Sequence, residues 1–255
     1  MVNWRNLAWV IDFSVMGKYI FIIFTFMIAS CNNDGEFDLG ENVEVILDVQ
    51  PFNKVRINSG FILEITQDSI QEVLLVSKET FIPNIAWYIK EGTLYFEDEN
   101  KFKWLRKHNP TTIKIRTPVL ERIDNYGSGS LIRSIDTLRF NTLTVNSKSH
   151  SSEFELLINN YNFNVVCNDI TTFKVSGRST IMDIFFAASD CRFEGENFSV
   201  TDITITHNST NDMILTALKS LTGELQSTGD VQYLQVPDSL AVTILGRGQL
   251  IYSGN

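Results

Sequence analysis

The fold of this chain is decided by a stretch that reads Leu120-Glu121-Arg122-Ile123-Asp124-Asn125-Tyr126-Gly127-Ser128-Gly129-Ser130-Leu131-Ile132. It contains a short apolar pair, a corner of small residues and a second apolar pair. Alternation of apolar residues at i and i+2 is typical of a strand with one buried face, and glycine lets the backbone turn sharply. The stretch therefore predicts a strand, a corner and a second strand.

The same pattern returns between about residues 119 and 252. The later copies are Phe173–Ile181, Ile203–Thr210, Leu225–Val231 and Val242–Ile251. Copies that begin at Ile203, near Leu221 and at Ala241 are roughly twenty residues apart, a period typical of solenoids rather than of a closed sandwich. The interval from Phe173 to Ile203 is longer, so the repeat is imperfect. One coil cannot bury enough apolar surface to hold alone, so we expect an all-β solenoid of stacked coils.

The first half of the folded part also shows the alternation of strands. We expect strands at Val43–Val49, Val55–Ile57, Phe61–Ile65, Val73–Val76, Trp87–Ile89, Leu94–Phe96 and Ile113–Ile115. Asn58-Ser59-Gly60 and Glu91-Gly92 predict the turns of two hairpins. Residues 97–110 predict an exposed excursion. This segment contains aromatic and cationic residues, which predict side chains that are partly buried and hold the loop against the domain; a ligand contact is the alternative. They are Phe102, Trp104, Arg106, Lys107 and His108.

Composition and charge limit the partners. The 255 residues carry a formal net charge of -9, and 44% of them are hydrophobic, which allows one large core. No stripe of Lys and Arg interleaved with aromatics is present, and an acidic body repels phosphate. We therefore expect no nucleic-acid partner.

The N-terminus predicts export and a lipid anchor. Residues 20–30 form an apolar run too short to span a bilayer, with Lys18 before it, as in a secretory signal peptide. Ile28-Ala29-Ser30-Cys31 resembles the bacterial lipobox, which implies cleavage before Cys31 and lipidation of its sulfur and new amine. Several acyl chains make a durable membrane anchor. The alternatives are an ordinary cleaved signal or an uncleaved anchor helix.

These features divide the chain into a signal peptide (1–30), a lipidated tether (31–42) and one β-solenoid domain (43–255). Trp4, Trp9 and Asp12 do not fit a short basic leader, so Met16 is the expected true start. The tether is polar and acidic, which predicts a flexible spacer; a surface-export address is the alternative. We expect a cell-envelope location, at the outer membrane, facing the periplasm or the surface.

Several short motifs together resemble one known family. They are Pro51–Val55, Asn58–Phe61, Glu91–Leu94, Pro118–Leu120, Tyr126–Ser130 and Gly246–Tyr252. In this order and spacing the chain resembles the head GIN domain family, also described as autotransporter-adhesin head domains, over roughly residues 49–252. The resemblance implies a right-handed parallel β-helix-like fold, a secreted or lipid-anchored protein and no catalytic activity. Asn146–Lys148 and His207–Ser209 stand where the family has glycine corners.

The cysteines and histidines offer two kinds of site. Cys167 and Cys191 lie among apolar neighbours, which predicts two buried thiols, with a disulfide permitted by an oxidising compartment as the alternative. His108, His150 and His207 show no metal-ligand spacing, so we expect no metal and no cofactor.

Acidic and nucleophilic residues do not form a catalytic pattern. Asp183, Asp190, Glu194 and Glu196 predict solvated corners rather than a calcium site or a pair of glycosidase carboxylates. The glycines around Ser128 are those of a corner, and no nucleophile elbow is present. We therefore expect no enzyme activity and no catalytic residue.

Three functions remain open. The first is a non-enzymatic envelope lipoprotein that binds a glycan or an envelope or surface protein through its solenoid face. Polar rows suited to such a ligand are formed by Thr142, Thr144, Asn146, Thr204, Thr206 and Asn208. The alternatives are a β-helix carbohydrate-active enzyme and a periplasmic structural or sensing lipoprotein. The first is the function we expect, and Cys31, as lipid attachment site, is the one functional residue that the sequence identifies.

Overall fold

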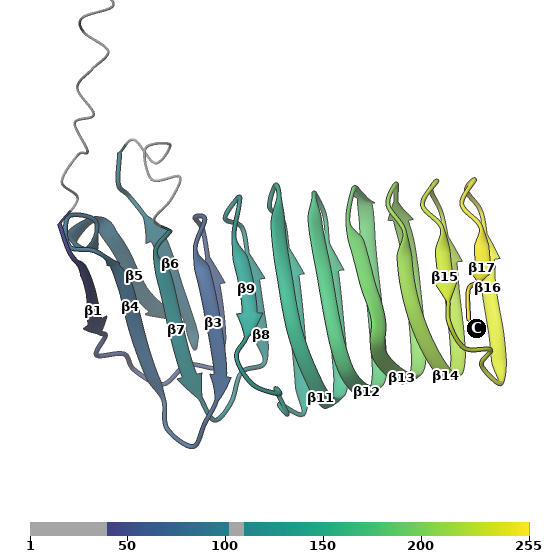
Figure 1. Ribbon diagram of the computed structural model, residues 1–255, viewed down its shortest axis with the longest axis horizontal. Coiled ribbons are helices and arrows are strands. Elements are labelled where there is room, and N and C mark those ends of the chain that lie inside the picture. The colour runs from purple at the N-terminus through teal and green to yellow at the C-terminus, as the bar shows by residue number, and fades with distance from the viewer. Residues whose placement is uncertain (1–39, 102–109, 255) are drawn as a thin grey trace, which may run out of the picture. The chain divides into compact units, whose positions relative to one another are not determined.

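The protein, seen in a computed structural model, is an all-β solenoid over residues 40–101 and 110–254, the residues that the structure describes (Figure 1). The chain divides into two units, Met1–Asp38 and Leu39–Asn255, and the first lies outside the described residues. The expected signal peptide, Met16 start and Cys31 lie there too. The one described helix, η1 (Ile82–Asn84), is a single short turn, and no described helix could cross a membrane.

The strands form one continuous hydrogen-bonded sheet that is folded into two facing layers. They are β1 (Asn42–Ile46), β2 (Lys54–Ile57), β3 (Ile62–Gln67), β4 (Glu72–Lys78), β5 (Ile85–Lys90), β6 (Thr93–Asp98), β7 (Thr112–Thr117), β8 (Arg122–Asn125), β9 (Leu131–Ser134), β10 (Thr142–Ser147), β11 (Ser152–Cys167), β12 (Thr171–Ser189), β13 (Arg192–Ser209), β14 (Met213–Leu225), β15 (Val231–Tyr233), β16 (Ser239–Ile244) and β17 (Leu250–Tyr252). Layer 1 contains, in spatial order, β5, β6, β2, β8, β10, the second halves of β11 to β14, and β16. Layer 2 contains β1, β4, β7, β3, β9, the first halves of β11 to β14, β15 and β17.

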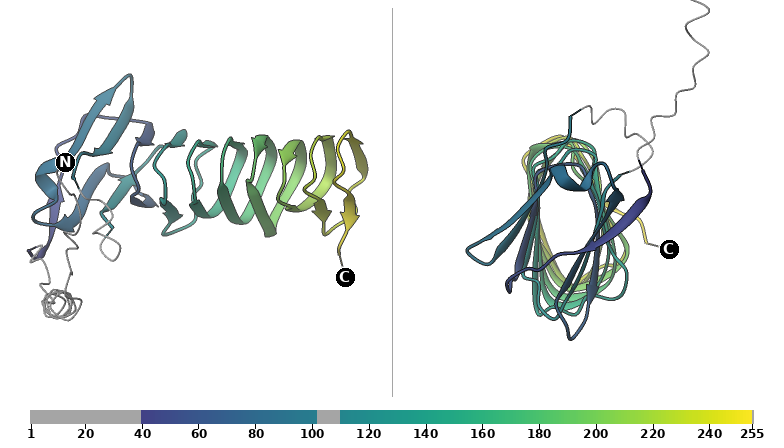
Figure 2. Two further views of the ribbon diagram at one scale, coloured as in Figure 1. Left: turned by 90° about the horizontal axis from the view of Figure 1, so that it is seen from above. Right: turned by 90° about the vertical axis from the view of Figure 1, so that its left-hand side faces the viewer.

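The coils stack in register, so equivalent side chains lie above one another. Each of β11 to β14 runs unbroken from layer 2 into layer 1, and the end-on view shows the coils superimposed as a flattened oval (Figure 2). Phe154 pairs with Phe173, and Phe173 with Phe193, in parallel register. The rings of Phe154 and Phe173 are stacked with centroids 4.9 Å apart, and all three side chains are fully buried. The expected solenoid is thus confirmed, with a core made of such columns.

The coils turn at two different corners, which explains the irregular spacing of the sequence copies. In the copy around Gly127 the chain passes from layer 1 to layer 2. In the copy Phe173–Ile181 it passes from layer 2 to layer 1, around Gly177. Gly177 has φ +101°, and a Cβ there would lie 2.0 Å from the Ile158 carbonyl oxygen, so only glycine fits. Phe173 therefore lies in layer 2 and Ile203 in layer 1. The interval between them is long because it covers one full coil and the additional passage from layer 2 to layer 1.

Only one of the two expected hairpins forms. β5 and β6 are antiparallel across Glu91 and Gly92, whose φ angles of 51° and 69° fit a tight two-residue turn. The second prediction was wrong: β2 and β3 lie in different layers, and residues 58–60 form a corner between them. Alternation of apolar residues is the same in both arrangements, so it did not distinguish a hairpin from a coil. Antiparallel β4, β1 and β5 are found at the N-terminal end of the stack (Figure 1).

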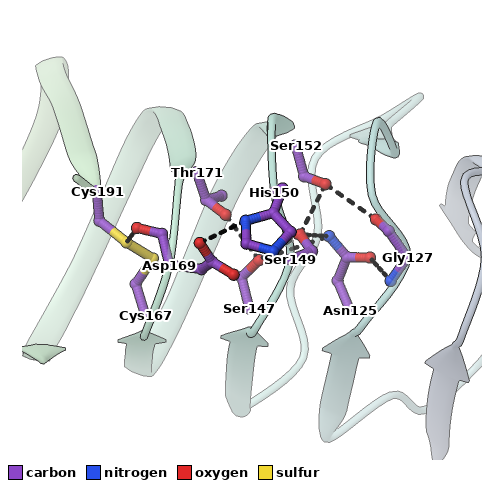
Figure 3. A network of polar contacts seen from close by, with 10 residues as sticks. All are labelled: Asn125, Gly127, Ser147, Ser149, His150, Ser152, Cys167, Asp169, Thr171 and Cys191. Carbon is purple, nitrogen blue, oxygen red and sulfur yellow. Dashed lines mark hydrogen bonds and ion pairs between the residues drawn. A yellow bond between two sulfur atoms is a disulfide. The ribbon is translucent and has the colours of Figure 1, made fainter. Parts of the chain in front are cut away.

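Polar side chains fill the inside of the first corner (Figure 3). The Asn125 amide donates to the Ser149 hydroxyl (2.8 Å), and the backbone N–H of Gly127 donates to Asn125 Oδ1 (3.1 Å). In the next coils Ser149 donates to Ser152 (2.7 Å), and Ser147 lies 2.8 Å from the Thr171 hydroxyl. At the Gly127 corner the Ser152 hydroxyl satisfies the turning backbone, since it donates to the Gly127 carbonyl (3.1 Å) and accepts from the Ser130 N–H (3.2 Å). In the coil where Asn146–Lys148 replaces a glycine corner, the hydroxyls bond to one another.

A disulfide joins Cys167 and Cys191 along the same line of the corner (Figure 3). The expectation of two buried free thiols was therefore wrong. Cys167 ends β11 and Cys191 precedes β13, so they come from successive coils; stacking places their Cα atoms 6.4 Å apart, within the range that a disulfide spans. The bond ties neighbouring coils to each other.

The outer face of layer 2 carries a column of alternating charge. Its members, in spatial order, are Lys114, Glu64, Arg133, Glu155, Lys174 and Glu194. Arg133 forms an ion pair with Glu64, and Lys174 lies 3.7 Å from Glu155. Directly opposed unlike charges favour this register over a shifted one. The outer face of layer 2 is thus largely self-neutralised.

Removing the disulfide should lower stability. In the double variant Cys167→Ala/Cys191→Ala the free energy of unfolding should fall by about 3 kcal/mol, because a closed loop with a sequence separation of 24 is released in the unfolded chain. Urea unfolding followed by circular dichroism, with and without dithiothreitol, measures this. The reductant should destabilise the wild type and leave the double variant unchanged; equal curves for the wild type in both conditions would show that no bond exists.

His207 should make the fold sensitive to acid. Its side chain is fully buried in layer 1, and burial lowers the pKa from 6.5 to about 4, against the opposing effect of Asp212 and Asp230. Below pH 6.5 the unfolded chain takes up a proton that the folded chain refuses, so stability present at pH 7 is lost as the pH falls towards 4. At pH 4.5 the loss from this group is about 2 kcal/mol.

The variant His207→Leu should remove this contribution, since leucine suits a position between Phe186 and Leu225. Urea unfolding at pH 7.0 and 4.5 should show a smaller acid-induced loss in the variant than in the wild type, while carboxylate effects remain in both. His150→Leu, which removes an exposed imidazole, is the matched control. An unchanged acid-induced loss in His207→Leu would contradict the assignment.

Candidate functional site: an aromatic and cationic surface on layer 1

A row of aromatic and cationic side chains projects outward from the N-terminal end of layer 1. Tyr88 on β5 pairs with Tyr95 on β6, and Tyr95 pairs with Arg56 on β2. Tyr126 follows β8, and Lys148 follows β10. We call these five residues the Tyr–Arg row. Stacking places Tyr88, Tyr95 and Arg56 at one position of the register. Asp124 and Asn146 occupy that position in the next two strands, and Tyr126 and Lys148 each lie two residues further along the chain.

The members of the row are in contact with each other. The rings of Tyr88 and Tyr95 are stacked, 4.7 Å apart and 8° from parallel. The Arg56 guanidinium lies 5.3 Å from the Tyr95 ring centroid and 4.8 Å from that of Tyr126, and the Lys148 ammonium lies 5.9 Å from Tyr126. These are cation–π distances. Tyr88 remains 48% exposed, so the flat end of the stack faces solvent.

Asp124 holds the arginines of this surface in place. Its carboxylate is 4% exposed and accepts hydrogen bonds from Arg56 Nη2 (3.3 Å), Arg122 Nε (2.8 Å) and the Asn146 amide (2.8 Å). A buried carboxylate with several charge-assisted hydrogen bonds fixes its partners. Arg56 and Arg122 are thus held in position, with side chains that remain 32% and 42% exposed.

A cleft of about 630 Å³ opens beside the row, on the same face. It lies between residues 118–121, before β8, and residues 139–141, before β10, where the chain passes from layer 2 into layer 1. Its charged lining consists of the cations Lys54, Arg122 and Arg139 and the carboxylate of Glu121. We call it the basic cleft. Its volume falls in the range of small-molecule sites.

The charges of this surface are not neutralised as they are on layer 2. Within residues 40–101 and 110–254, Lys54, Arg139 and Lys148 form no ion pair. The Glu121 carboxylate accepts a hydrogen bond from the Asn53 amide (2.8 Å) instead of from a cation. The surface therefore carries cations available to a ligand, on a chain whose net charge is -9.

Three of the six polar residues predicted from the sequence lie on this surface. Thr142 and Thr144 line the basic cleft, and Asn146 binds Asp124. Thr204 and Thr206 also face outward on layer 1, several coils further along. The sixth member, Asn208, lies near the corner that follows, so the six residues do not form one site.

Two of the four acidic residues considered for an enzyme lie together: Glu194 and Glu196 line a shallow pocket of about 360 Å³ on layer 2, which Lys174 also lines. The other two lie elsewhere. Asp183 projects from layer 1, whereas Glu194 belongs to layer 2 and binds Arg192 (2.6 Å). Glu196 follows on layer 2, and Asp190 lies at a corner, where it binds Thr210.

The histidines and other expected site residues also lie apart. His150 binds Asp169 at the corner with 2.7 Å between Nδ1 and Oδ1, and His207 is buried in the core. Cys31 and the segment with Phe102, Trp104, Arg106, Lys107 and His108 lie outside the described residues. Among the described residues, no group of three or more His, Cys, Asp or Glu side chains is arranged to hold a metal ion.

Sequence reasoning missed the Tyr–Arg row. Its residues are spread from position 56 to position 148 and follow no motif. They become neighbours only through the pairing of β5, β6, β2, β8 and β10, which the sequence does not reveal. One signal was available: Arg56 and Tyr95 each occupy an outward position of an expected strand.

Comparison with protein families gives a match over most of the chain. Residues 51–237 match the family model described as "Putative auto-transporter adhesin, head GIN domain". The chain belongs to this family. The expected head GIN domain is thus confirmed, and it includes the Tyr–Arg row and the basic cleft. No curated protein matched the chain.

Solved structures share the fold of this head GIN domain. A crystal structure described as a putative adhesin from Bacteroides fragilis is similar with a TM-score of 0.73 and 16% identity, over 82% of this chain and 95% of that one. Another, described as a putative lipid binding protein from Parabacteroides distasonis, has a TM-score of 0.60 and 11% identity, over 83% and 97%. A putative adhesin from Parabacteroides merdae has a TM-score of 0.53 and 13% identity, also over 83% and 97%. At these identities the likeness shows a shared fold, and none of the three descriptions names an enzyme.

Proposed function

We propose that this head GIN domain is an adhesin-like binding protein of the cell envelope, held to a membrane by lipid on Cys31. Its ligand is a glycan that contacts the Tyr–Arg row. The family description and the fold of solved adhesin-like relatives support a binding role. The apolar run and lipobox-like segment at residues 20–31 support the anchor.

The observation that carries the binding role is the exposed stack of Tyr88 on Tyr95. A tyrosine ring offers a flat apolar face with a polar edge, and such rings are enriched where proteins bind partners. Arg56, next in the row, supplies donors to hydroxyl groups above the ring face. The contacts among Tyr95, Arg56 and Tyr126 keep the surface ordered before a ligand arrives, which lowers the entropic cost of binding.

A carbohydrate-active enzyme is supported less well. Glycoside hydrolysis uses two carboxyl groups on opposite sides of the scissile bond. In the basic cleft, Glu121 is accompanied by cations, and Asp124 next to it is held by two arginines. This arrangement suits binding better than proton transfer.

Loss of the exposed ring should weaken glycan binding. Tyr88→Ala should reduce affinity about tenfold on a glycan array and in follow-up calorimetry, because one aromatic contact and its burial are lost. Tyr161→Ala is the matched control, since Tyr161 is 54% exposed on a coil corner away from the row. Equal effects of the two variants, or no glycan bound by the wild type, would refute the proposed surface.

Loss of the lipid attachment site should change location. Cys31→Ala should leave the precursor unprocessed or release it from the membrane fraction, because the thioether forms on this sulfur and a protein without acyl chains has no anchor. Fractionation, metabolic labelling with an alkyne fatty acid and intact-mass measurement check this. Cys167→Ala is the control for loss of a cysteine. Normal processing and membrane retention of Cys31→Ala would contradict the proposed anchor.

A further inference from the structure

We infer that the glycan is acidic and that the basic cleft binds its carboxylate or sulfate group. This inference rests on the proposed function and extends it to the ligand class. It concerns a site separate from the Tyr88 face, so each has its own test.

The charged groups that line the cleft suit an anion. Lys54, Arg122 and Arg139 are its cations, and Glu121 is its one acid, which gives a local excess of positive charge. Arginine donates two parallel hydrogen bonds that match a carboxylate or sulfate, and lysine adds a point charge. A neutral sugar would leave Lys54 and Arg139 without a charged partner, since of the three cations only Arg122 is paired, with Asp124.

Two cations of the cleft have no carboxylate partner among the described residues, although the Arg139 guanidinium donates to the Thr137 carbonyl (3.3 Å). Within the described parts of the chain, Lys54 and Arg139 form no ion pair, although acidic residues outnumber basic ones by 30 to 21 in the whole sequence. On layer 2, by contrast, Arg133 is paired with Glu64, Lys174 with Glu153 and Arg192 with Glu194. Unpaired cations grouped in a cleft on an acidic protein direct anions to that cleft.

The basic cleft and the Tyr–Arg row lie within reach of a single ligand. Lys54 and Arg56 are two residues apart on β2, so their outward side chains start about 7 Å from each other along the strand. Arg122 in the cleft and Arg56 in the row bind the same carboxylate, Asp124. One oligosaccharide can therefore place a sugar ring on the tyrosines and its acidic group in the cleft.

A membrane of acidic phospholipids presents anions too, but the surroundings favour a glycan. The exposed apolar lining of the cleft is limited to Pro118 and Val119, the latter 44% exposed. The neighbouring row offers stacked rings rather than an aliphatic surface. A uronan fits this combination of flat rings and cations, because each of its sugar rings carries a carboxylate.

The test compares two probes that differ only in charge. Polygalacturonate oligomers and their methyl esters have the same sugar chain, and esterification removes the carboxylate charge. Calorimetry on the full chain in neutral detergent at 50 mM NaCl should give at least tenfold tighter binding of the acid form. Chondroitin sulfate oligomers should bind as well, and binding of both acidic probes should weaken at 500 mM NaCl.

Variants locate the effect. Lys54→Gln/Arg139→Gln should lower affinity for polygalacturonate at least tenfold and leave affinity for the methyl ester unchanged. The matched control Lys219→Gln/Arg247→Gln removes the same charge from exposed positions elsewhere and should change neither. Thermal unfolding confirms that each variant is folded.

The outcomes separate the two proposals. Equal affinity for acid and ester, together with a loss in Tyr88→Ala, would overturn the acidic-ligand inference and leave the glycan-binding function intact. Equal losses in the cleft and control variants would overturn it as non-specific attraction. Binding to phosphatidylglycerol vesicles but to no glycan would overturn both, whereas a charge-dependent loss confined to Lys54→Gln/Arg139→Gln supports the inference.

Discussion

Parallel stacking in register is the constraint on which the rest of this structure depends. A strand in the solenoid satisfies its backbone groups only through the coils on either side, so the position of each residue fixes its neighbour one coil away. The columns of phenylalanine, the hydroxyl chain at the corner and the Cys167–Cys191 bond are three results of this rule. A shift by one residue in any coil would turn buried side chains outward throughout that coil.

The candidate site is formed by the same constraint on the outer face. Tyr95, Arg56 and Asp124 are far apart in sequence, yet they lie in consecutive strands of layer 1 at one position of the register. The antiparallel hairpin β5–β6 adds Tyr88 to the end of the line. The hairpin that covers the N-terminal end of the solenoid therefore also contributes two tyrosines to the candidate site. A rigid stack then holds the rings and guanidinium groups in fixed order, which suits recognition of an extended ligand.

Sequence reasoning predicted what depends on local pattern. Alternation gave the strands, and the period of roughly twenty residues gave the solenoid. The Glu91-Gly92 turn was recognised because positive φ angles need such residues. Relations between coils could not be predicted in the same way. Four features depend on which strands become neighbours: the corner at residues 58–60, the layer to which Phe173 belongs, the disulfide and the Tyr–Arg row. Apolar alternation is the same for every possible pairing of strands, so it could not predict them.

The alternating charges on layer 2 restrict how such a chain can lengthen by duplication. From Glu64 through Arg133, Glu155, Lys174 and Glu194 the sign changes at every step. Copying one coil, for example the one with Lys174, would set two like charges opposite each other, and that costs stability. Copying two successive coils would keep the alternation. A pair of coils, rather than the single coil that the backbone repeats, is therefore the unit by which the ladder of charges can grow without conflict.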